Sequence, residues 1–334
     1  MGEPVNVLYV GDALDELRKL PPNSVDMCLT SPPYFRLRDY GADGQLGLEA
    51  NVDAWAEAIR AIAVEIRRVL VSTGTFWLNL GDTYANHPRQ GAPSKSLLLA
   101  PERVAQLLQQ DGWIVRNKII WAKPNPMPSS VGDRLTAAHE VIYLFAKQGR
   151  YHFDLDAIRR PHRSRPGNPP CPATRRPGKE RWRGPNADST TGLAAMKARG
   201  IVGHPLGKNP GDVWTIATAA GKGSHHAAFP EPLAIKCIQA GAPEARCVTC
   251  RAPWRRPIRR LGATATRLAL QATCAHEGDP EPGIVLDPFM GSGSTAVVAE
   301  ALGRQWVGIE LNPTFAEEAL ARIVAARPRS PPHE

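Results

Sequence analysis

Short apolar runs alternate along most of the chain with longer stretches whose apolar residues recur at helical spacing. The apolar runs predict strands, and these lie at 6–10, 25–30, 74–79, 113–121, 140–146, 284–287 and 306–310. The helical spacing predicts helices, and these lie after Asp12 and at 52–70, 96–110, 232–240, 294–302 and 313–326. This alternation predicts an α/β fold with a seven-stranded mixed sheet and helices on both faces.

The pattern is lost in the middle of the chain. Residues 159–183 hold nine Arg or Lys and six Pro, with Glu180 as the one acidic residue. Without a hydrophobic period, this segment is predicted to be loop or locally disordered. One interpretation is a solvated basic linker, and the other is a surface that follows a phosphate backbone. Trp182 among the arginines favours the second, because aromatic rings stack on bases.

Composition narrows the setting. The chain has 334 residues and a net charge of +9, which allows one large core and favours a polyanionic partner. No apolar stretch approaches the ~20 residues of a membrane span, and Met-Gly-Glu-Pro at the start does not resemble a secretory signal. Six cysteines in a chain of this length do not indicate a disulfide framework, so we expect a reducing, cytoplasmic setting.

The strand 25–30 ends on a rigid corner, Ser31-Pro32-Pro33-Tyr34. Prolines cannot continue a central strand, and they force the preceding residue into extended geometry. The corner presents a hydroxyl, a backbone carbonyl that no ladder uses, and an aromatic ring. These groups suit a planar base with an exocyclic amino group, although such a corner taken alone is more often a simple turn.

A second motif lies near the other end of the chain. The strand 284–287 ends in Asp287 and is followed by a turn containing Gly291 and Gly293 before a helix. Glycines let the backbone approach a ligand, and a helix amino terminus attracts a carboxylate. Glu310 ends the next strand, where an acidic residue takes up ribose hydroxyls in nucleotide-binding α/β folds.

Together, Ser-Pro-Pro-Tyr at 31–34 and Asp-Pro-Phe-Met-Gly-Ser-Gly-Ser-Thr at 287–295 resemble the motifs of DNA amino-methyltransferases that use S-adenosyl-L-methionine (SAM). The catalytic motif precedes the cofactor motif, an order that resembles the beta class of that family. The resemblance implies the Rossmann-like SAM-dependent methyltransferase fold. It also implies a catalytic half at 1–150, a target-recognition segment at 151–208, a SAM-binding half at 209–243 and 283–326, and a tail at 327–334.

The resemblance further implies residue roles. Ser31 and the Pro32 carbonyl would accept the amino hydrogens of the base, beside Pro33, and Tyr34 would stack on a base flipped out of the helix. Asp12 would bind the adenine of SAM and Asp287 its methionine end. The cofactor residues it implies are Asp12, Thr30, Phe229, Pro230, Asp287, Pro288, Phe289, Gly291, Ser292, Gly293, Ser294, Thr295, Glu310 and Asn312. The expected DNA contacts are Arg36, Arg38, Arg175, Arg176, Arg181, Trp182 and Arg183.

The identity of the substrate rests on one position. Ser31 favours the N4 amino group of cytosine in double-stranded DNA, because Asp is commoner there in the adenine-N6 enzymes, which remain the alternative. RNA or protein-glutamine methyltransferases with a similar corner usually place the cofactor motif first and have Asn in place of Ser. A non-catalytic nucleic-acid-binding protein would explain the charge but not both motifs. A second copy of the chain and a restriction endonuclease acting on the same site are candidate partners.

A cysteine-rich insertion is expected at 244–282. Cys247-x-x-Cys250 is followed, after 23 residues, by Cys274-x-His276. Two such pairs can hold one tetrahedral Zn²⁺ in a small ribbon, and scattered thiols in a basic insertion are the alternative. Several arginines between the pairs could also touch nucleic acid.

Overall fold

A computed structural model of the chain describes residues 5–162, 203–218, 230–261 and 264–327. The chain divides into two compact units. The first consists of Met1–Asp154, Gly211–Arg255 and Leu270–Glu334, and the second consists of Leu155–Pro210 and Arg256–Ala269. The first unit therefore draws on both ends of the sequence.

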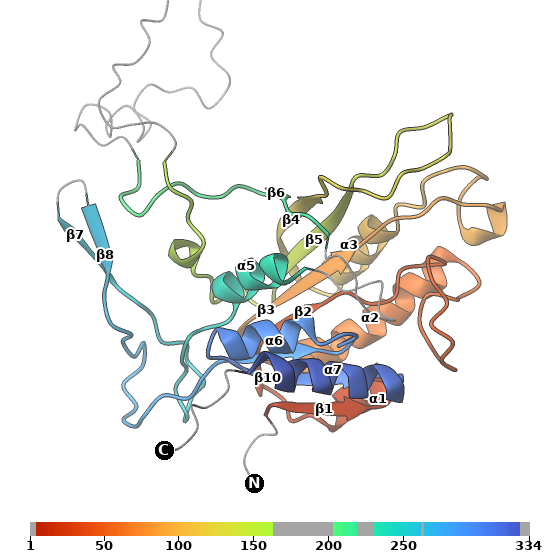
Figure 1. Cartoon of the computed structure of the whole chain (residues 1–334). Helices are drawn as coiled ribbons and strands as arrows, with labels where there is room; N and C mark the ends of the chain where they lie inside the picture. Colours follow the sequence, from red (N-terminus) through yellow and green to blue (C-terminus); the bar gives the residue numbers. More distant parts are fainter. Residues whose placement is uncertain (1–4, 163–202, 219–229, 262–263, 328–334) are drawn as a thin grey trace, which may run out of the picture. The chain divides into compact units, whose positions relative to one another are not determined.

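One mixed sheet forms the centre of the first unit (Figure 1). Its eight strands, in spatial order, are β1 (Val7–Val10), β10 (Gln305–Glu310), β9 (Ile284–Asp287), β2 (Val25–Thr30), β3 (Leu70–Leu80), β5 (His139–Ala146), β4 (Ile114–Ala122) and β6 (Val213–Thr215). Neighbouring strands are parallel except at β5, which runs antiparallel to both β3 and β4. The seven strands expected from the sequence all form, within a few residues of their predicted bounds.

The eighth strand, β6, corrects the predicted seven-stranded sheet. It has three residues, of which only Trp214 is buried, so it is too short to show a period in the sequence. It pairs in parallel with β4, which places Trp214 beside Trp121. The Trp121 indole N–H donates to the carbonyl of Ile216, 2.8 Å away, and fixes the chain beyond the strand.

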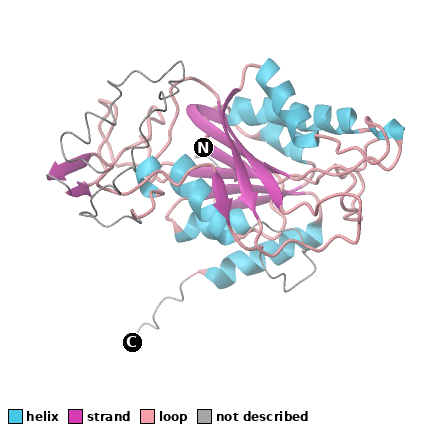
Figure 2. Cartoon of the chain, turned by 90° about the horizontal axis from the view of Figure 1, so that it is seen from above, coloured by secondary structure: helices cyan, strands magenta, loops and turns pink. Residues whose placement is uncertain are grey.

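Helices cover both faces of this sheet (Figure 2). On one face pack α1 (Ala13–Lys19), α2 (Val52–Val69) and α3 (Ala100–Gln110), and on the other α5 (Glu231–Gly241), α6 (Ser294–Ala301) and α7 (Pro313–Ala326). A 3₁₀ turn, η1 (Pro88–Gln90), lies between β3 and α3. No helix in the described part of the chain is long and apolar enough to cross a membrane.

Polar caps and apolar stripes explain where the helices lie. Asp12, Asn51 and Asn312 cap α1, α2 and α7 by accepting backbone N–H groups of the first turn. The apolar stripe predicted for α2 is buried against the sheet. Helix α3 starts four residues later than the predicted 96, because Leu98 still donates its N–H to the Thr83 carbonyl at 3.0 Å.

The strand order places a crevice between β9 and β2. From β9 the chain passes through α6 to β10, and from β2 it passes through α2 to β3 in the opposite direction along the sheet. Parallel sheets bind their ligands at such a reversal, outside the carboxyl ends of the strands. Asp12, Ser31, Asp287 and Glu310 all stand at the carboxyl ends of these central strands.

The second unit contains a short 3₁₀ turn and a basic hairpin. The turn is η2 (Leu155–Ala157), and the hairpin consists of β7 (Ile258–Leu261) and β8 (Thr264–Arg267) in antiparallel register. Arg160 and Lys208 exchange backbone hydrogen bonds of 3.0 and 2.8 Å within this unit.

A buried ion pair joins the cysteine-rich insertion to the sheet. The guanidinium of Arg246 is fully buried and lies 3.0 Å from Asp26 on β2 and 2.8 Å from Glu281. The Asp26 carboxyl also accepts the N–H of Ile284 on β9, at 2.8 Å. Burial raises the pKa of Asp26 to about 6, and the positive charge of Arg246 limits the rise. The pair therefore links two central strands to the chain that precedes Cys247.

Replacing Arg246 should therefore be costly. We expect Arg246→Met to lower the free energy of unfolding by about 3–5 kcal/mol, because Asp26 would remain buried without its cation. The matched control is Arg18→Ala, which removes an exposed pair with Asp15 and should cost about 1 kcal/mol or less. Urea unfolding measures both, and equal losses in the two variants would contradict the importance of the buried pair.

Candidate active site at the carboxyl ends of the strands

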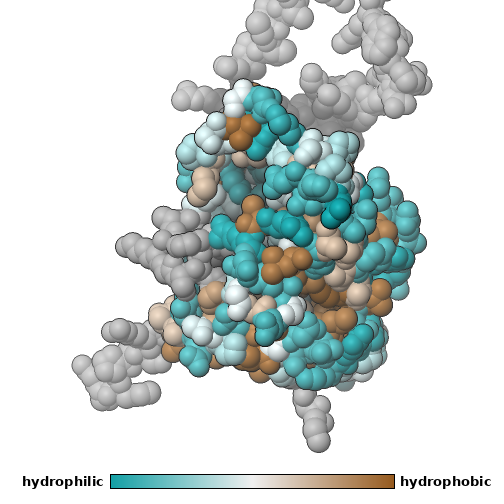
Figure 3. Space-filling view, turned by 90° about the vertical axis from the view of Figure 1, so that its right-hand side faces the viewer, coloured by the Kyte–Doolittle hydropathy of each residue, from teal (hydrophilic) through white to brown (hydrophobic). Residues whose placement is uncertain are grey.

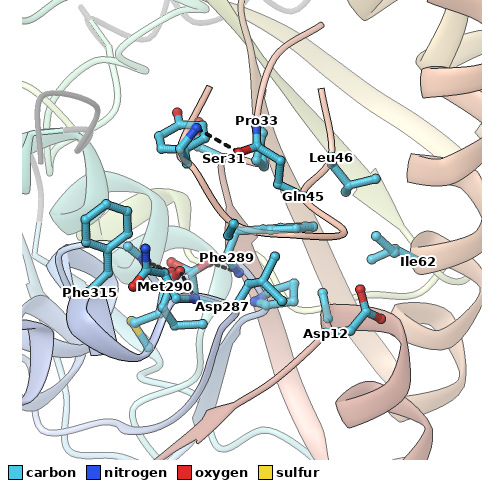
Figure 4. Close-up of a pocket in the computed structure, with 18 of the residues that line it drawn as sticks. Asp12, Ser31, Pro33, Gln45, Leu46, Ile62, Asp287, Phe289, Met290 and Phe315 are labelled. Carbon is cyan, nitrogen blue, oxygen red and sulfur yellow. Dashed lines mark hydrogen bonds between the residues drawn. The ribbon is translucent and has the colours of Figure 1, made fainter. Parts of the chain in front are cut away.

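A cavity opens at the carboxyl ends of β1, β10, β9 and β2 (Figure 4). It encloses about 1220 Å³, part of which is open solvent at its mouth. Twelve residues implied by the family resemblance line it: Asp12, Ser31, Pro33, Asp287, Pro288, Phe289, Gly291, Ser292, Ser294, Thr295, Glu310 and Asn312. The structure therefore brings the corner and the glycine-rich turn, some 250 residues apart in sequence, to one space.

The Asp287 carboxyl links the two segments that form this cavity. Its side chain is 1% exposed, and one carboxyl oxygen accepts the Thr30 hydroxyl at 2.6 Å and the Phe289 N–H at 3.1 Å. The other oxygen accepts the Thr295 hydroxyl at 2.6 Å. Burial raises the pKa of Asp287 to about 6, and these hydrogen bonds oppose the rise. Thr30, which does not line the cavity, thus contributes by fixing Asp287.

The glycine-rich turn is held by Glu310. Gly291 and Gly293 have φ of +51° and +77°, a backbone conformation that residues other than glycine rarely adopt. The Gly291 N–H donates to one carboxyl oxygen of Glu310 at 2.8 Å, and the Asn312 N–H donates to the other at 3.0 Å. Glu310 therefore shapes the turn and also faces the cavity.

Arg322 supports the same turn from α7, and no motif in the sequence marks it. Its guanidinium donates to the Ser292 carbonyl at 2.9 Å and to the Ser294 hydroxyl at 3.0 Å. It also pairs with Glu231 at 2.7 Å, at the start of α5. Pro230, the residue before Glu231, is buried but does not line the cavity.

The Ser31–Tyr34 corner is held by a polar network that the sequence did not predict. The Ser31 and Tyr34 hydroxyls lie 3.0 Å apart, and Tyr34 donates to the Glu140 carboxylate at 2.7 Å. The Asn79 amide donates to the Tyr34 hydroxyl at 2.7 Å and to Glu140 at 2.8 Å, and Lys123 pairs with Glu140 from the other side. Burial and the nearby Glu140 raise the pKa of Tyr34 well above its usual value, so the phenol stays neutral.

Close packing fixes the corner further. The Trp55 indole N–H donates to the Pro33 carbonyl at 2.9 Å. The Tyr34 ring lies so close to Gly81 that a Cβ there would come within 2.6 Å of it. Within the described residues, no hydrogen bond reaches the carbonyl of the buried Pro32. Pro33 lines the cavity and Tyr34 does not, so base stacking by Tyr34 stays a prediction.

A positional signal could have found this network. Asn79 lies near the end of β3, and Glu140 lies near the start of β5, which is antiparallel, so both reach the same edge of the sheet as Ser31. Polar residues at strand ends on that edge are candidates for a site. No spacing rule could have paired them, because 61 positions separate the two.

The irregular loop after the corner lines the cavity through Tyr40, Gln45 and Leu46. The Tyr40 N–H donates to the Gln45 side chain at 2.7 Å, which in turn donates to the Arg38 carbonyl at 3.3 Å. Arg36 is exposed on the same loop. The contact of Arg36 and Arg38 with DNA stays a prediction.

The cysteine-rich insertion gathers its four candidate ligands. One ligand atom from each of Cys247, Cys250, Cys274 and His276 lies within 4.8 Å of all the others. Backbone N–H groups of Cys250 and Thr249 lower the pKa of the Cys247 thiol to about 6.

Six of the residues predicted to bind DNA or the cofactor lie outside the described part of the chain: Arg175, Arg176, Arg181, Trp182, Arg183 and Phe229.

A family model described as DNA methylase, of the N6/N4 type, matches residues 25–321. The chain belongs to the N6/N4 DNA methylase family. It is 32% identical to the Type II methyltransferase M.SfiI of Streptomyces fimbriatus, over 98% of this chain and 93% of that protein. It is 33% identical to M.SmaI of Serratia marcescens, over 96% of this chain and 91% of that protein. The protein is thus a SAM-dependent DNA methyltransferase, which confirms the resemblance seen in the sequence.

Solved structures support the fold of this methylase. The PvuII DNA methyltransferase, described as cytosine-N4-specific, superposes with a TM-score of 0.58 at 17% identity, covering 97% of this chain and 92% of that one. TTHA0409 of Thermus thermophilus, a putative DNA modification methylase solved with SAM, gives 0.53 at 20% identity, covering 97% and 96%. The predicted Rossmann-like methyltransferase fold is therefore confirmed.

The raised pKa of Asp287 in this methylase predicts a pH dependence of stability. A carboxyl whose pKa is about 6 when folded and 3.8 when unfolded binds more protons in the native state between these values. Its stabilising contribution is complete below pH ~4 and is lost as the pH rises through about 6. Asp287→Asn should remove that loss, which is on the order of 3 kcal/mol.

The measurement is the free energy of unfolding in urea from about pH 4 to about pH 7, for the wild type and for Asp287→Asn. Asp15→Asn, at an exposed position of α1, is the control and should keep the wild-type slope. The same slope in all three proteins would mean that Asp287 does not titrate in this range.

Proposed function

We propose that this methyltransferase transfers a methyl group from SAM to the exocyclic N4 amino group of a cytosine flipped out of duplex DNA. The observation that carries the proposal is the shared cavity: Ser31 of the corner lines the same space as Asp12, Asp287 and Glu310. A site that joins an acceptor for an amino group to a nucleotide-type pocket suits transfer between a base and a nucleoside cofactor.

The residues present fit SAM. Phe289 and Phe315 give the cavity flat aromatic walls that suit adenine, and Ile62 adds an apolar contact. Asp12 and Glu310 place carboxyl groups at the ends of β1 and β10, where hydroxyl and amino groups of a nucleoside would be bound. Bound there, SAM supplies an electrophilic methyl group on a sulfonium.

The amino terminus of α6 and its glycine-rich turn complete the pocket. Gly291 has no side chain to keep a ligand from the backbone, and the positive end of the helix dipole favours a carboxylate. Asp287 accepts three hydrogen bonds from the protein itself. We therefore assign Asp287 to positioning the turn that faces the methionine end.

The corner supplies acceptors for the amino group. Nitrogen whose lone pair is delocalised into a ring is a weak nucleophile, so its placement matters more than a strong base. Ser31 Oγ and the Pro32 carbonyl would each accept one amino hydrogen and so direct the nitrogen toward the methyl group. Placement of this kind is worth up to ~7–11 kcal/mol in favourable systems.

The network behind Ser31 favours its acceptor role. Because Tyr34 donates its proton to Glu140, its oxygen is left to accept the proton of Ser31, 3.0 Å away. Ser31 Oγ also accepts the Asn79 amide at 3.3 Å, which leaves its second lone pair for an amino hydrogen of the base. The Glu140 carboxylate lies at the end of this chain of hydrogen bonds. Its negative charge stabilises the positive charge that develops on the attacking nitrogen.

Cytosine is favoured over adenine by Ser31, because the adenine-N6 relatives of the motif more often carry Asp. The adenine-N6 activity is the second candidate. A hydroxyl accepts more weakly than a carboxylate, so the difference between the bases is a matter for the product assay below.

The face around the cavity suits nucleic acid. The loop after the corner, which lines the cavity, carries Arg36 and Arg38. Figure 3, which looks onto the right-hand side of Figure 1, shows isolated apolar groups among mostly hydrophilic ones. We further propose that the basic segment containing Arg175, Arg176, Arg181, Trp182 and Arg183 follows the phosphate backbone.

The first test concerns the cofactor. Glu310→Ala should weaken SAM binding at least tenfold, about 1.4 kcal/mol, because two backbone N–H groups lose their acceptor and the ribose loses a carboxyl partner. Glu317→Ala, on the exposed side of α7, should bind SAM as the wild type does. Isothermal titration calorimetry measures the SAM affinity of both variants. Wild-type affinity in Glu310→Ala would show that SAM does not bind beside Glu310.

The second test concerns the reaction. Ser31→Ala should bind SAM as well as the wild type but turn over about 100-fold more slowly, because it removes a group that acts on the base. Ser72→Ala, at an exposed position of β3, is the control and should keep full activity. Turnover is followed as methyl incorporation into duplex DNA.

The product decides the base. Methylated DNA digested to nucleosides should contain N4-methylcytosine when analysed by mass spectrometry. N6-methyladenine instead would overturn the cytosine assignment but leave the class of enzyme unchanged. Wild-type turnover by Ser31→Ala would show that the Ser31 hydroxyl takes no part in the reaction.

A further inference from the structure

The cysteine-rich insertion forms a compact set of soft ligands outside the active site. Cys247 and Cys250 come from one turn, Cys274 and His276 from another, and their ligand atoms lie within 4.8 Å of one another. A tetrahedral zinc site with Zn–S bonds of about 2.3 Å has ligand atoms about 3.8 Å apart. Small side-chain rotations would bring the four atoms to that spacing.

The backbone around the first pair is shaped for a thiolate. The N–H groups of Thr249 and Cys250 point at the Cys247 sulfur. The Cys247 carbonyl also accepts the Arg251 N–H, and the Cys247 N–H donates to the Ala252 carbonyl, both at 2.9 Å, which closes a tight turn. Arg251 has a φ of +61°, an uncommon conformation for a residue other than glycine. The turn brings the Cys247 and Cys250 sulfurs within 4.8 Å of each other.

This segment has almost no core of its own. From 270 to 280 most of the described residues are exposed and Cys274 is half-buried; polar contacts, namely backbone hydrogen bonds and the ion pairs of Arg246 and Arg251 with Glu281, hold the insertion at its base. At its base, Arg246 and Glu281 exchange backbone hydrogen bonds of 2.8 and 3.0 Å. A chain that buries so little apolar surface needs a cross-link to hold one conformation.

The ligand set indicates which cross-link. Three sulfurs and one imidazole nitrogen in a tetrahedral arrangement are typical of structural zinc, whereas a catalytic zinc keeps a position open for water. None of the four residues lines the active-site cavity. The described cysteines are free thiols, so no disulfide competes for these sulfurs.

We propose that Cys247, Cys250, Cys274 and His276 bind one structural Zn²⁺. Binding takes three thiolates and a neutral imidazole, so thiol protons are released to solvent as the metal enters. The ion closes the chain from 247 to 276 into a loop, and that loop contains the β7–β8 hairpin with its exposed Arg259 and Arg260. The insertion is thereby a zinc ribbon added to the methyltransferase sheet.

Metal content tests the proposal directly. Protein purified without chelator should contain about one zinc per chain by inductively coupled plasma mass spectrometry. Cys274→Ser and His276→Ala should lose at least nine-tenths of that zinc after dialysis, while Glu277→Gln, an exposed neighbour, should retain it. Zinc at background level in the wild type, or full zinc in Cys274→Ser, would overturn the site.

Stability and spectroscopy separate a structural site from a surface contaminant. A strong chelator should lower the melting temperature of the wild type by about 5 °C or more, and added Zn²⁺ but not Mg²⁺ should restore it. Chelation should leave the melting temperature of Cys274→Ser unchanged. Cobalt substituted for zinc should show the visible bands of a tetrahedral thiolate site.

The zinc cluster is separate from the methyl-transfer site. Because the cluster does not line the cavity, SAM affinity of the zinc-depleted wild type should stay within about twofold of the loaded protein. Two results would show that no structural zinc is bound here. One is a wild-type melting temperature that does not change with chelator or with added zinc. The other is a Cys247–Cys250 disulfide found by mass spectrometry of alkylated protein.

Discussion

The candidate active site depends on the buried carboxyl of Asp287, which accepts hydrogen bonds from hydroxyl groups in two distant parts of the chain. Thr30 at the end of β2 and Thr295 at the start of α6 both donate to it at 2.6 Å. The corner begins immediately after Thr30. The glycine-rich turn ends at Gly293, two residues before Thr295. A carboxyl this deeply buried is stable only when its oxygens are fully hydrogen-bonded, so the site is rigid at the point where its halves meet.

The polar groups around that point are arranged by the direction of the strands. β2, β3, β9 and β10 are parallel, so their last residues reach one edge, and antiparallel β5 brings its first residues to the same edge. Glu140 can therefore hold Tyr34, although it opens a strand while the corner ends one. Direction within the sheet, not nearness in sequence, selects the residues of the site.

Sequence patterns were sufficient where local rules dominate. Strands 25–30 and 284–287 and helix 313–326 have the predicted bounds, because strong apolar patterns and polar caps define them. The three-residue β6 could not be predicted, since its place depends on pairing with β4. Glu140, Asn79 and Arg322 were missed for the same reason: their roles are contacts between remote segments, and no local spacing encodes them.

The place of β9 has a consequence for how such proteins can vary. β9 and β10 come late in the chain, yet they lie between β1 and β2, and β1 is hydrogen-bonded to β10 alone among the described strands. Each strand is held by its spatial neighbours, so the sheet does not depend on which of its segments is synthesised first. A gene could begin at either half and still encode the same arrangement of Ser31, Asp287 and Glu310, which means that segment order can drift in evolution while the chemistry stays fixed.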